Sequence, residues 1–141
     1  MARQAIRDAT RDSLLLELAA GHERWAKQGA PRISYRVQEL CFCPTIGDIS
    51  ASTTILAVGD SVHAVVNAIG EPTQSLYPND GRPSIPFLFE RAEAAIRGNA
   101  DGIVVTFHPI FGFPTRVAVD RRVNVTDDEL DIVVSHISLV P

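Results

Sequence analysis

Residues 53–68 read TTILAVGDSVHAVVNA, and this stretch indicates which kind of sheet the chain builds. Two strand-like apolar runs, 53–58 and 61–68, are separated by Gly59-Asp60, a two-residue turn of the kind that joins hairpin strands. Because so short a connection joins antiparallel neighbours, the sequence predicts an antiparallel sheet. The register expected for this hairpin pairs Ala57 with Val62, Leu56 with His63, and Ile55 with Ala64.

Alternating apolar and polar residues predict further strands on both sides of this hairpin. One, at about 33–38, precedes it, and three follow at about 103–108, 116–120 and 130–139. In each of them every second side chain is mainly apolar, which is typical of a strand that buries one face. The chain therefore carries about six strands.

Two helices are expected, one before each group of three strands. Apolar positions recur at three- and four-residue steps within residues 1–28, and Gly29 ends that helix. Ser84 caps a second helix, which ends at Gly98. The order is thus α-βββ-α-βββ, and the fold class is α+β, an antiparallel sheet with both helices on one face. We expect residues 1–141 to form a single domain with one long loop, 69–84.

Composition and charge argue against several classes of partner. The chain carries 17 acidic and 13 basic residues, and the basic ones are dispersed, so it has no stripe for nucleic acid and no polybasic membrane patch. No apolar run reaches the roughly 18 to 20 residues that span a bilayer. The charged N-terminal stretch does not fit a signal peptide. We therefore expect a cytoplasmic protein, or an extracytoplasmic one whose export signal has been removed.

Cys41 and Cys43, the only two cysteines, stand in the stretch CFCP and allow four interpretations. In an extended strand their α-carbons would be roughly 6.5–7 Å apart, at the upper limit for a disulfide, so a disulfide requires a break in the strand. Two free thiols require none. A redox pair needs a nearby cation that lowers the thiol pKa, and a zinc site needs two further ligands. The oxidation state depends on the compartment, so all four interpretations stay open.

The stretch FHPIFGFPTR, residues 107–116, joins two predicted strands, and Gly112 can supply a positive φ in the turn. Turns between strands are normally polar, but three apolar side chains stand in this one: Ile110, Phe111 and Phe113. They either fold back onto the core or, with His108, form an exposed contact surface. The sequence places no nucleophile or second acid beside His108, so we assign no catalytic residue and expect no cofactor.

An acidic stretch precedes the last predicted strand. Asp127, Asp128 and Glu129 are candidates for metal ligands, because carboxylate oxygens at this density suit calcium. They are weak candidates. The spacing lacks the alternating acidic positions and the turn glycine of an EF-hand loop. We therefore interpret the stretch as a solvated loop that keeps the sheet edge from pairing.

A series of short motifs runs along the chain. In order, they are Trp25, Ser34-Tyr35-Arg36, Cys41-Phe42-Cys43-Pro44, Leu88-Phe89, Phe107-His108-Pro109, Gly112-Phe113-Pro114-Thr115, Asp120 and Asp127-Asp128-Glu129. This series resembles a bacterial family, domain of unknown function 6174, whose members are mostly small exported proteins or lipoproteins. The resemblance implies an extracytoplasmic location and brings no known activity.

These features predict a non-enzymatic binding or envelope-associated domain. The 69–84 loop and the 109–114 turn would form its contact surface for an unknown protein or small ligand. The alternative, from another class, is a thiol-based redox protein or sensor that uses Cys41 and Cys43. The sequence does not decide the oligomeric state.

Overall fold

The computed structural model describes residues 2–41, 53–66, 84–98, 100, 102–120 and 129–141. Its elements follow the predicted order α-βββ-α-βββ. They are α1 (Ala2–Ala26), β1 (Arg32–Cys41), β2 (Thr53–Val58), β3 (Ser61–Val66), α2 (Ile85–Arg97), β4 (Gly102–Phe107), β5 (Pro114–Asp120) and β6 (Glu129–Leu139). The predicted helix and strand types are all confirmed.

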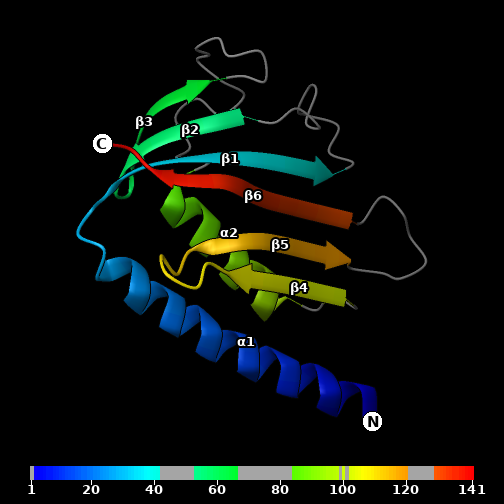
Figure 1. Cartoon of the computed structure of the whole chain (residues 1–141). Coiled ribbons are helices and arrows are strands. Elements are labelled where there is room, and N and C mark those ends of the chain that lie inside the picture. The colour runs from blue at the N-terminus through cyan, green and yellow to red at the C-terminus, as the bar shows by residue number, and fades with distance from the viewer. Residues whose placement is uncertain (1, 42–52, 67–83, 99, 101, 121–128) are drawn as a thin grey trace.

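The strands form one sheet in the order β3-β2-β1-β6-β5-β4 (Figure 1). Each neighbouring pair is antiparallel. The sheet therefore consists of two three-stranded meanders, β1-β2-β3 and β4-β5-β6, which are joined side by side through β1 and β6. The first and last strands of the chain thus meet at the centre of the sheet.

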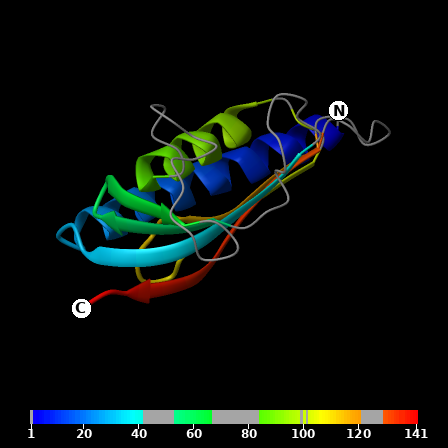
Figure 2. The same ribbon diagram turned by 90° about the horizontal axis from the view of Figure 1, so that it is seen from above.

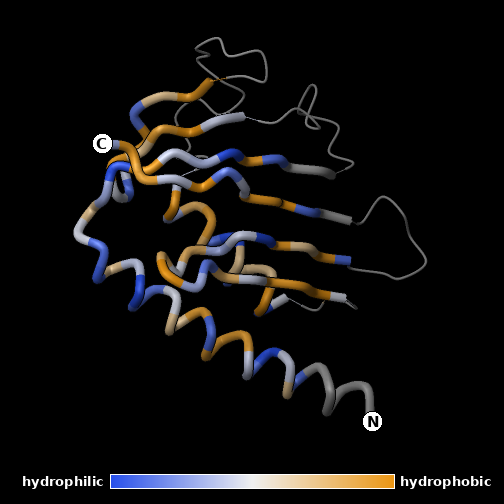
Figure 3. The backbone as a smooth tube through the Cα atoms, in the orientation of Figure 1, coloured by the Kyte–Doolittle hydropathy of each residue, from blue (hydrophilic) through white to orange (hydrophobic). Residues whose placement is uncertain are grey.

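Both helices lie on the same face of the sheet, as predicted, and the other face is left uncovered by them (Figure 2). Helix α2 packs against β5, while α1 packs against α2 and reaches β4 at the sheet edge. Apolar and polar residues alternate along the strands (Figure 3), and the apolar ones face the helices to form the core. The most deeply buried side chains of this core are Tyr35, Phe113, Ile33, Ile55, Ile85, Leu88, Ile132 and Val117.

Helix α2 begins and ends where its capping residues predict. The Ser84 side chain accepts a hydrogen bond from the Phe87 backbone N–H at 3.2 Å, which satisfies one of the donors at the helix start. Gly98 is the C-terminal cap, and its N–H donates to Ala94 O at 3.1 Å. On the buried side of α2, Phe89 stacks with His22 of α1, with ring centroids 3.9 Å apart.

The β2–β3 hairpin departs from its predicted register by one residue. Ala57 pairs with Val62 as expected, but a bulge follows, so that Leu56 pairs with Ala64 and Ile55 with Val65. The predicted pairs of Leu56 with His63 and of Ile55 with Ala64 are therefore wrong. The extra residue lets two of the valines of β3, Val62 and Val65, pack against the core opposite buried partners.

A second bulge lies where β6 passes β1. Ser34 pairs with Ser138 and Arg36 with Ser135, so two residues of β6 lie opposite Tyr35 alone. One of them, His136, has a φ of 54°, in the left-handed region that L residues rarely adopt. This is the geometry of a bulge whose first residue is usually glycine.

Candidate functional site

The turn between β4 and β5, residues 108–113, is the predicted site segment that the structure describes in full. We refer to it as the 108–113 turn. Its ends are joined by a hydrogen bond from His108 N to Phe113 O at 2.8 Å, and Gly112 N donates to His108 O at 3.0 Å. Gly112 has a φ of 86°, which confirms the positive φ predicted for it. The backbone therefore closes into a tight turn with glycine at the one position that requires it.

The side chain of His108 completes this turn. Its Nδ1 accepts hydrogen bonds from the backbone N–H groups of Ile110, at 3.1 Å, and Phe111, at 3.0 Å. A backbone N–H can only donate, so Nδ1 must carry its lone pair and the ring proton must lie on Nε2. Burial, followed by the positive charge of Arg24, lowers the pKa of His108 and so favours this neutral ring.

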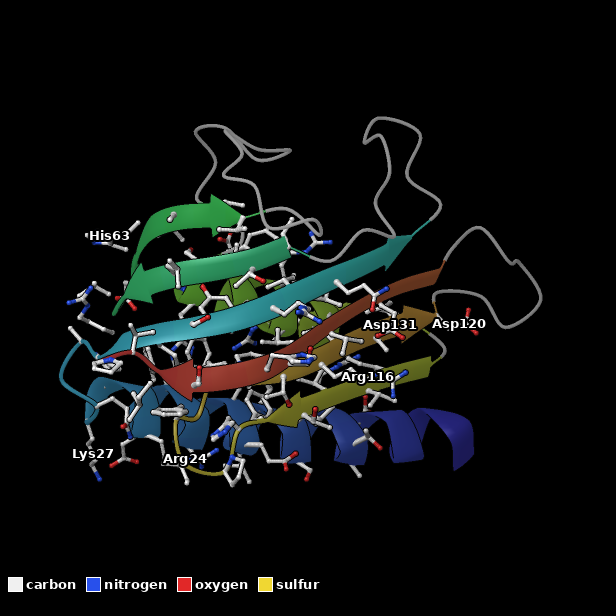
Figure 4. All side chains as sticks on the ribbon, turned by 45° about the horizontal axis from the view of Figure 1, so that its top comes forward. Arg24, Lys27, His63, Arg116, Asp120 and Asp131 are labelled. Carbon is white, nitrogen blue, oxygen red and sulfur yellow. The ribbon has the colours of Figure 1, made fainter. Side chains whose placement is uncertain are left out.

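Helix α1 holds the turn from the other side. Arg24 Nη2 donates to His108 O at 3.3 Å, and Gln28 Nε2 donates to Ile110 O at 3.2 Å. Figure 4 labels Arg24 on α1, beside the turn. The backbones of α1 and the turn also meet directly, because a Cβ on Gly21 would collide with Gly112 O, and a Cβ on Gly112 would lie 2.8 Å from the Arg24 Cβ.

Phe113 is the centre of an aromatic cluster and not part of an exposed surface. It is 0% exposed, and its ring lies 5.6 Å from Trp25, 6.1 Å from Tyr35 and 5.7 Å from His108, centroid to centroid. Of the two alternatives for this side chain, Phe113 takes the one in which it folds back onto the core, and its assignment to an exposed contact surface is wrong. The physical reason is that the turn folds back onto α1, which directs this ring into the layer between helix and sheet.

The other predicted contact residues of the turn are exposed to different degrees. Phe111 and His108 are half-buried, and their rings pack against each other with centroids 4.8 Å apart. Ile110 is 65% exposed at the tip. Of the four residues expected to form a contact surface, Ile110 is thus the one whose side chain is mainly accessible.

Several residues of this site were not identified from the sequence. Gly21, Arg24, Trp25 and Gln28 all contact the turn or its aromatic cluster. Their spacing of three, one and three residues places them on one face of a helix, which is the signal that could have grouped them. What the sequence does not show is that this face meets a turn that lies far along the chain.

Trp25 links the cluster to the β2–β3 hairpin. Its Nε1 donates to Asp60 Oδ1 at 2.8 Å, and Asp60 stands in the predicted two-residue turn. The neighbouring Gly59 N donates to Pro31 O at 2.9 Å. The end of α1 is thereby attached to the two hairpin turns that lie within the described residues.

The uncovered face of the sheet carries an ion pair near the acidic stretch. Arg116 of β5 donates from Nε to Asp131 Oδ1 at 3.2 Å and from Nη2 to Asp131 Oδ2 at 3.1 Å (Figure 4). Hydrogen bonding to Asp131 raises the pKa of Arg116. The carboxylate of Asp131 thus forms a two-bond ion pair with the guanidinium, and this pair links β5 to β6.

Two of the three weak candidates for metal ligands lie outside the described residues. Asp127 and Asp128 lie outside the described residues, and Glu129 is described only as the first residue of β6, opposite Asp120. Within the described ranges, no three His, Cys, Asp or Glu side chains are grouped to hold a metal ion. One carboxyl oxygen of Asp120 is buried and has no hydrogen-bond partner in that part of the chain.

The cysteine pair and the predicted long loop also lie partly outside the described residues. Cys41 is the last residue of β1, where its backbone pairs with Leu130, and Cys43 lies outside the described residues. The disulfide, free-thiol, redox and zinc interpretations therefore stay predictions. Residues 69–83 of the predicted loop are also outside, while Ser84 belongs to the start of α2.

Comparison with known proteins gives a family. The described helices include none that is both long and apolar enough to cross a membrane. No curated protein and no solved structure matches the chain. A family model matches residues 17–139, which covers all six strands and both helices except the first part of α1. The chain therefore belongs to the family of unknown function DUF6174, the family that its motif series resembles.

Proposed function

We propose that this chain is a non-enzymatic protein-binding domain and that its contact surface is centred on Ile110. The observation that carries the proposal is one large aliphatic side chain, 65% exposed, at the tip of a turn whose backbone is hydrogen-bonded to the His108 side chain and to α1. Such a side chain is suited to insert into an apolar pocket of a partner. One polar side chain of α1, Gln28, lies beside it, as polar groups do at the rim of a protein interface.

The rigidity of the turn supports this function. Ile110 N donates to His108 Nδ1, and Ile110 O accepts from Gln28, so both backbone polar groups of the residue are already satisfied within the domain. Binding a partner then requires little ordering of the turn, and less of the interaction free energy is spent on lost conformational entropy. A single exposed aliphatic residue on a mobile loop would have no such advantage.

The neighbouring residues extend the surface. Pro109 is exposed beside Ile110, and Phe111 is half-buried on its other side. Gln28 of α1 contributes a polar edge. The chemistry is that of a small apolar contact with a polar border, which fits a shallow apolar pocket on another protein. Phe113 does not touch a partner in this arrangement and acts as the support beneath the turn.

The test compares Ile110→Ser with Leu16→Ser. Leu16 is a matched control because it is a large aliphatic residue, 74% exposed, on α1. Each full-length variant is tagged, expressed at equal level in the native host and cross-linked, and the proteins retained are quantified. We expect Ile110→Ser to reduce the retained partner by about tenfold or more, as for a residue that dominates an interface, and Leu16→Ser to leave it unchanged.

Thermal unfolding of the purified variants shows that the fold is kept. Both changes replace exposed side chains, so the melting temperatures should stay within a few degrees of the wild type. Equal retention of the partner by Ile110→Ser and the wild type would overturn the proposal. Equal loss with both variants would also overturn it, because the effect would then be one of general surface hydrophobicity.

A further inference from the structure

We propose that His108 is a proton-operated latch that keeps the 108–113 turn closed on α1, and that protonation of its Nδ1 opens the turn. The inference concerns a conformational device of the fold and stands independently of the proposed binding at Ile110. It rests on which atoms His108 engages and on where the turn is attached.

The geometry makes the closed turn incompatible with a charged ring. Nδ1 accepts from Ile110 N at 3.1 Å and from Phe111 N at 3.0 Å. A protonated imidazole has N–H groups at both nitrogens and no acceptor. Three N–H groups would then point at one another, and the backbone N–H groups of Ile110 and Phe111 would lose their partner. Leaving a half-buried donor unsatisfied is unfavourable, so the turn must rearrange when the proton binds.

The rearrangement has a direct route to the rest of the site. The His108 ring packs against Phe111 and Phe113, with centroids 4.8 Å and 5.7 Å away. Phe113 in turn meets Trp25 edge to face, at 5.6 Å and 90°. A change of the His108 ring position therefore alters the surroundings of Trp25, which is the only tryptophan in the chain. Its fluorescence reports on the latch.

Among the charged and titratable groups near His108, Arg24 is the one whose charge lowers the pKa of the imidazole. Arg24 of α1 lies against the turn and donates to His108 O, so a positive imidazole would meet a like charge. Tyr35 of β1 lies behind Phe113, and burial raises the pKa of its phenol, so it stays neutral. Asp60, in the β2–β3 turn, contacts the far side of the cluster through Trp25.

These contacts fix the sign of the pH dependence. The pKa of His108 is lowered from 6.5 in the folded protein, first by burial and then by Arg24. A group with a depressed folded pKa favours folding when deprotonated. Its contribution is fully present above the unfolded pKa of about 6.5 and is lost as the pH falls from there through the folded pKa.

The experiment compares wild type with His108→Asn and His108→Ala. Asparagine places an amide oxygen where Nδ1 stands and can accept from the same backbone N–H groups, but it does not titrate. Urea unfolding of the full chain is followed by Trp25 fluorescence between pH 5 and pH 8, where ordinary carboxyl groups stay ionised. The remaining histidines, His22, His63 and His136, are present in all three proteins and cancel in the comparison.

We expect the ratio of folded to unfolded wild type to fall, relative to His108→Asn, by up to about tenfold per pH unit below pH 6.5. His108→Ala should be less stable than the wild type at pH 7.5 and above. The difference in stability between His108→Ala and His108→Asn should not change with pH, because neither variant has a titrating group at this position. The same pH profile in wild type and His108→Asn would overturn the proposal.

A measurement on the wild type alone keeps the test decisive if a variant fails to fold. Nitrogen-15 NMR of the histidine rings at pH 7.5 should show His108 with its proton on Nε2. Amide hydrogen exchange at Ile110 and Phe111, corrected for intrinsic rates, should rise by at least tenfold between pH 7.5 and pH 5, while exchange in α2 stays constant. A proton on Nδ1 at pH 7.5, or protection at these two amides that does not change with pH, would overturn the inference.

Discussion

His136 and Ala30 are non-glycine residues whose backbones adopt the left-handed conformation, each with a φ of 54°. For an L residue this conformation costs roughly 1–2 kcal/mol relative to a right-handed one. Ala30 follows Gly29, whose φ is 69°, in the connection from α1 to β1. His136 forms the bulge in β6, where its Nδ1 lies 3.0 Å from Ser135 Oγ. The fold imposes both conformations through the elements on either side.

Replacing His136 by glycine tests this strain. We expect His136→Gly to be more stable than His136→Ala by about 1 kcal/mol, because both variants lose the imidazole while only glycine adopts a positive φ without steric conflict. The free energy of unfolding from urea titration measures the difference. Equal stability of the two variants would show that the β6 bulge does not strain the backbone.

Helix α1 is attached to the sheet at its C-terminal half by direct contact between backbones. Gly21 of the helix lies against Gly112 of the 108–113 turn, and neither position has room for a Cβ. Arg24 and Gln28 then donate to carbonyls of the turn. In the N-terminal part of the helix, the side chains of Asp8, Ala9 and Thr10 are exposed. The docking of α1 therefore uses the helix from Leu14 onward, because Leu14 and Leu18 are also buried in the core.

The contact at Gly21 reverses the usual effect of a helix substitution. In an exposed helix, glycine to alanine stabilises by roughly 1 kcal/mol, but Gly21→Ala should destabilise the protein by about 1–3 kcal/mol because the new methyl group meets Gly112 O. The control is Ala20→Gly, at an exposed position of α1, where only the propensity loss of about 1 kcal/mol is expected. Urea titration compares the two, and a Gly21→Ala variant more stable than wild type would contradict the described contact.

Local signals predicted the elements well, because each depends on neighbours in the sequence. Gly59-Asp60, Ser84 and Gly112 were all placed correctly from turn and capping chemistry. The one-residue error at His63 arose because the bulge is set by which valines reach the core, and not by the hairpin turn. Register at this level depends on which side chains pack into the core, and alternation alone does not contain that information.

The candidate site was predicted less well for a related reason. The stretch 107–116 was selected because its apolar residues are unusual in a turn, and Ile110 is indeed exposed. The burial of Phe113 and the bonds to His108 Nδ1 depend on α1, which contacts the turn across most of the chain length. No pattern within the turn indicates that a helix face will cover it.

In the molecule as a whole, Phe113 joins the two layers. Its ring contacts Trp25 from α1 and Tyr35 from β1, while its own backbone closes the turn between β4 and β5. One side chain thus lies where the helix layer, the central strand and the second meander meet. Its contribution is to the assembly of the fold and not to a surface.

Truncation of this side chain should destabilise the whole domain. We expect Phe113→Ala to lower the free energy of unfolding by about 3–5 kcal/mol, as for other fully buried phenylalanines. Ile110→Ala, three residues away in the same turn, should change it by no more than about 0.5 kcal/mol because the side chain is exposed. Chemical denaturation measures both. A small effect of Phe113→Ala would mean that the turn does not pack against the core as described.

The pairing of β1 with β6 has a consequence for the synthesis of the protein. The residues at the middle of the sheet come from opposite ends of the described chain, so the central ladder forms only after residues 129–139 have left the ribosome. Until then the meander β1-β2-β3 presents β1 as an unpaired edge, which can pair with other nascent chains. Sheets closed by such distant contacts also fold slowly. We therefore expect the β1 edge to stay open to wrong pairing until residues 129–139 are available to cover it.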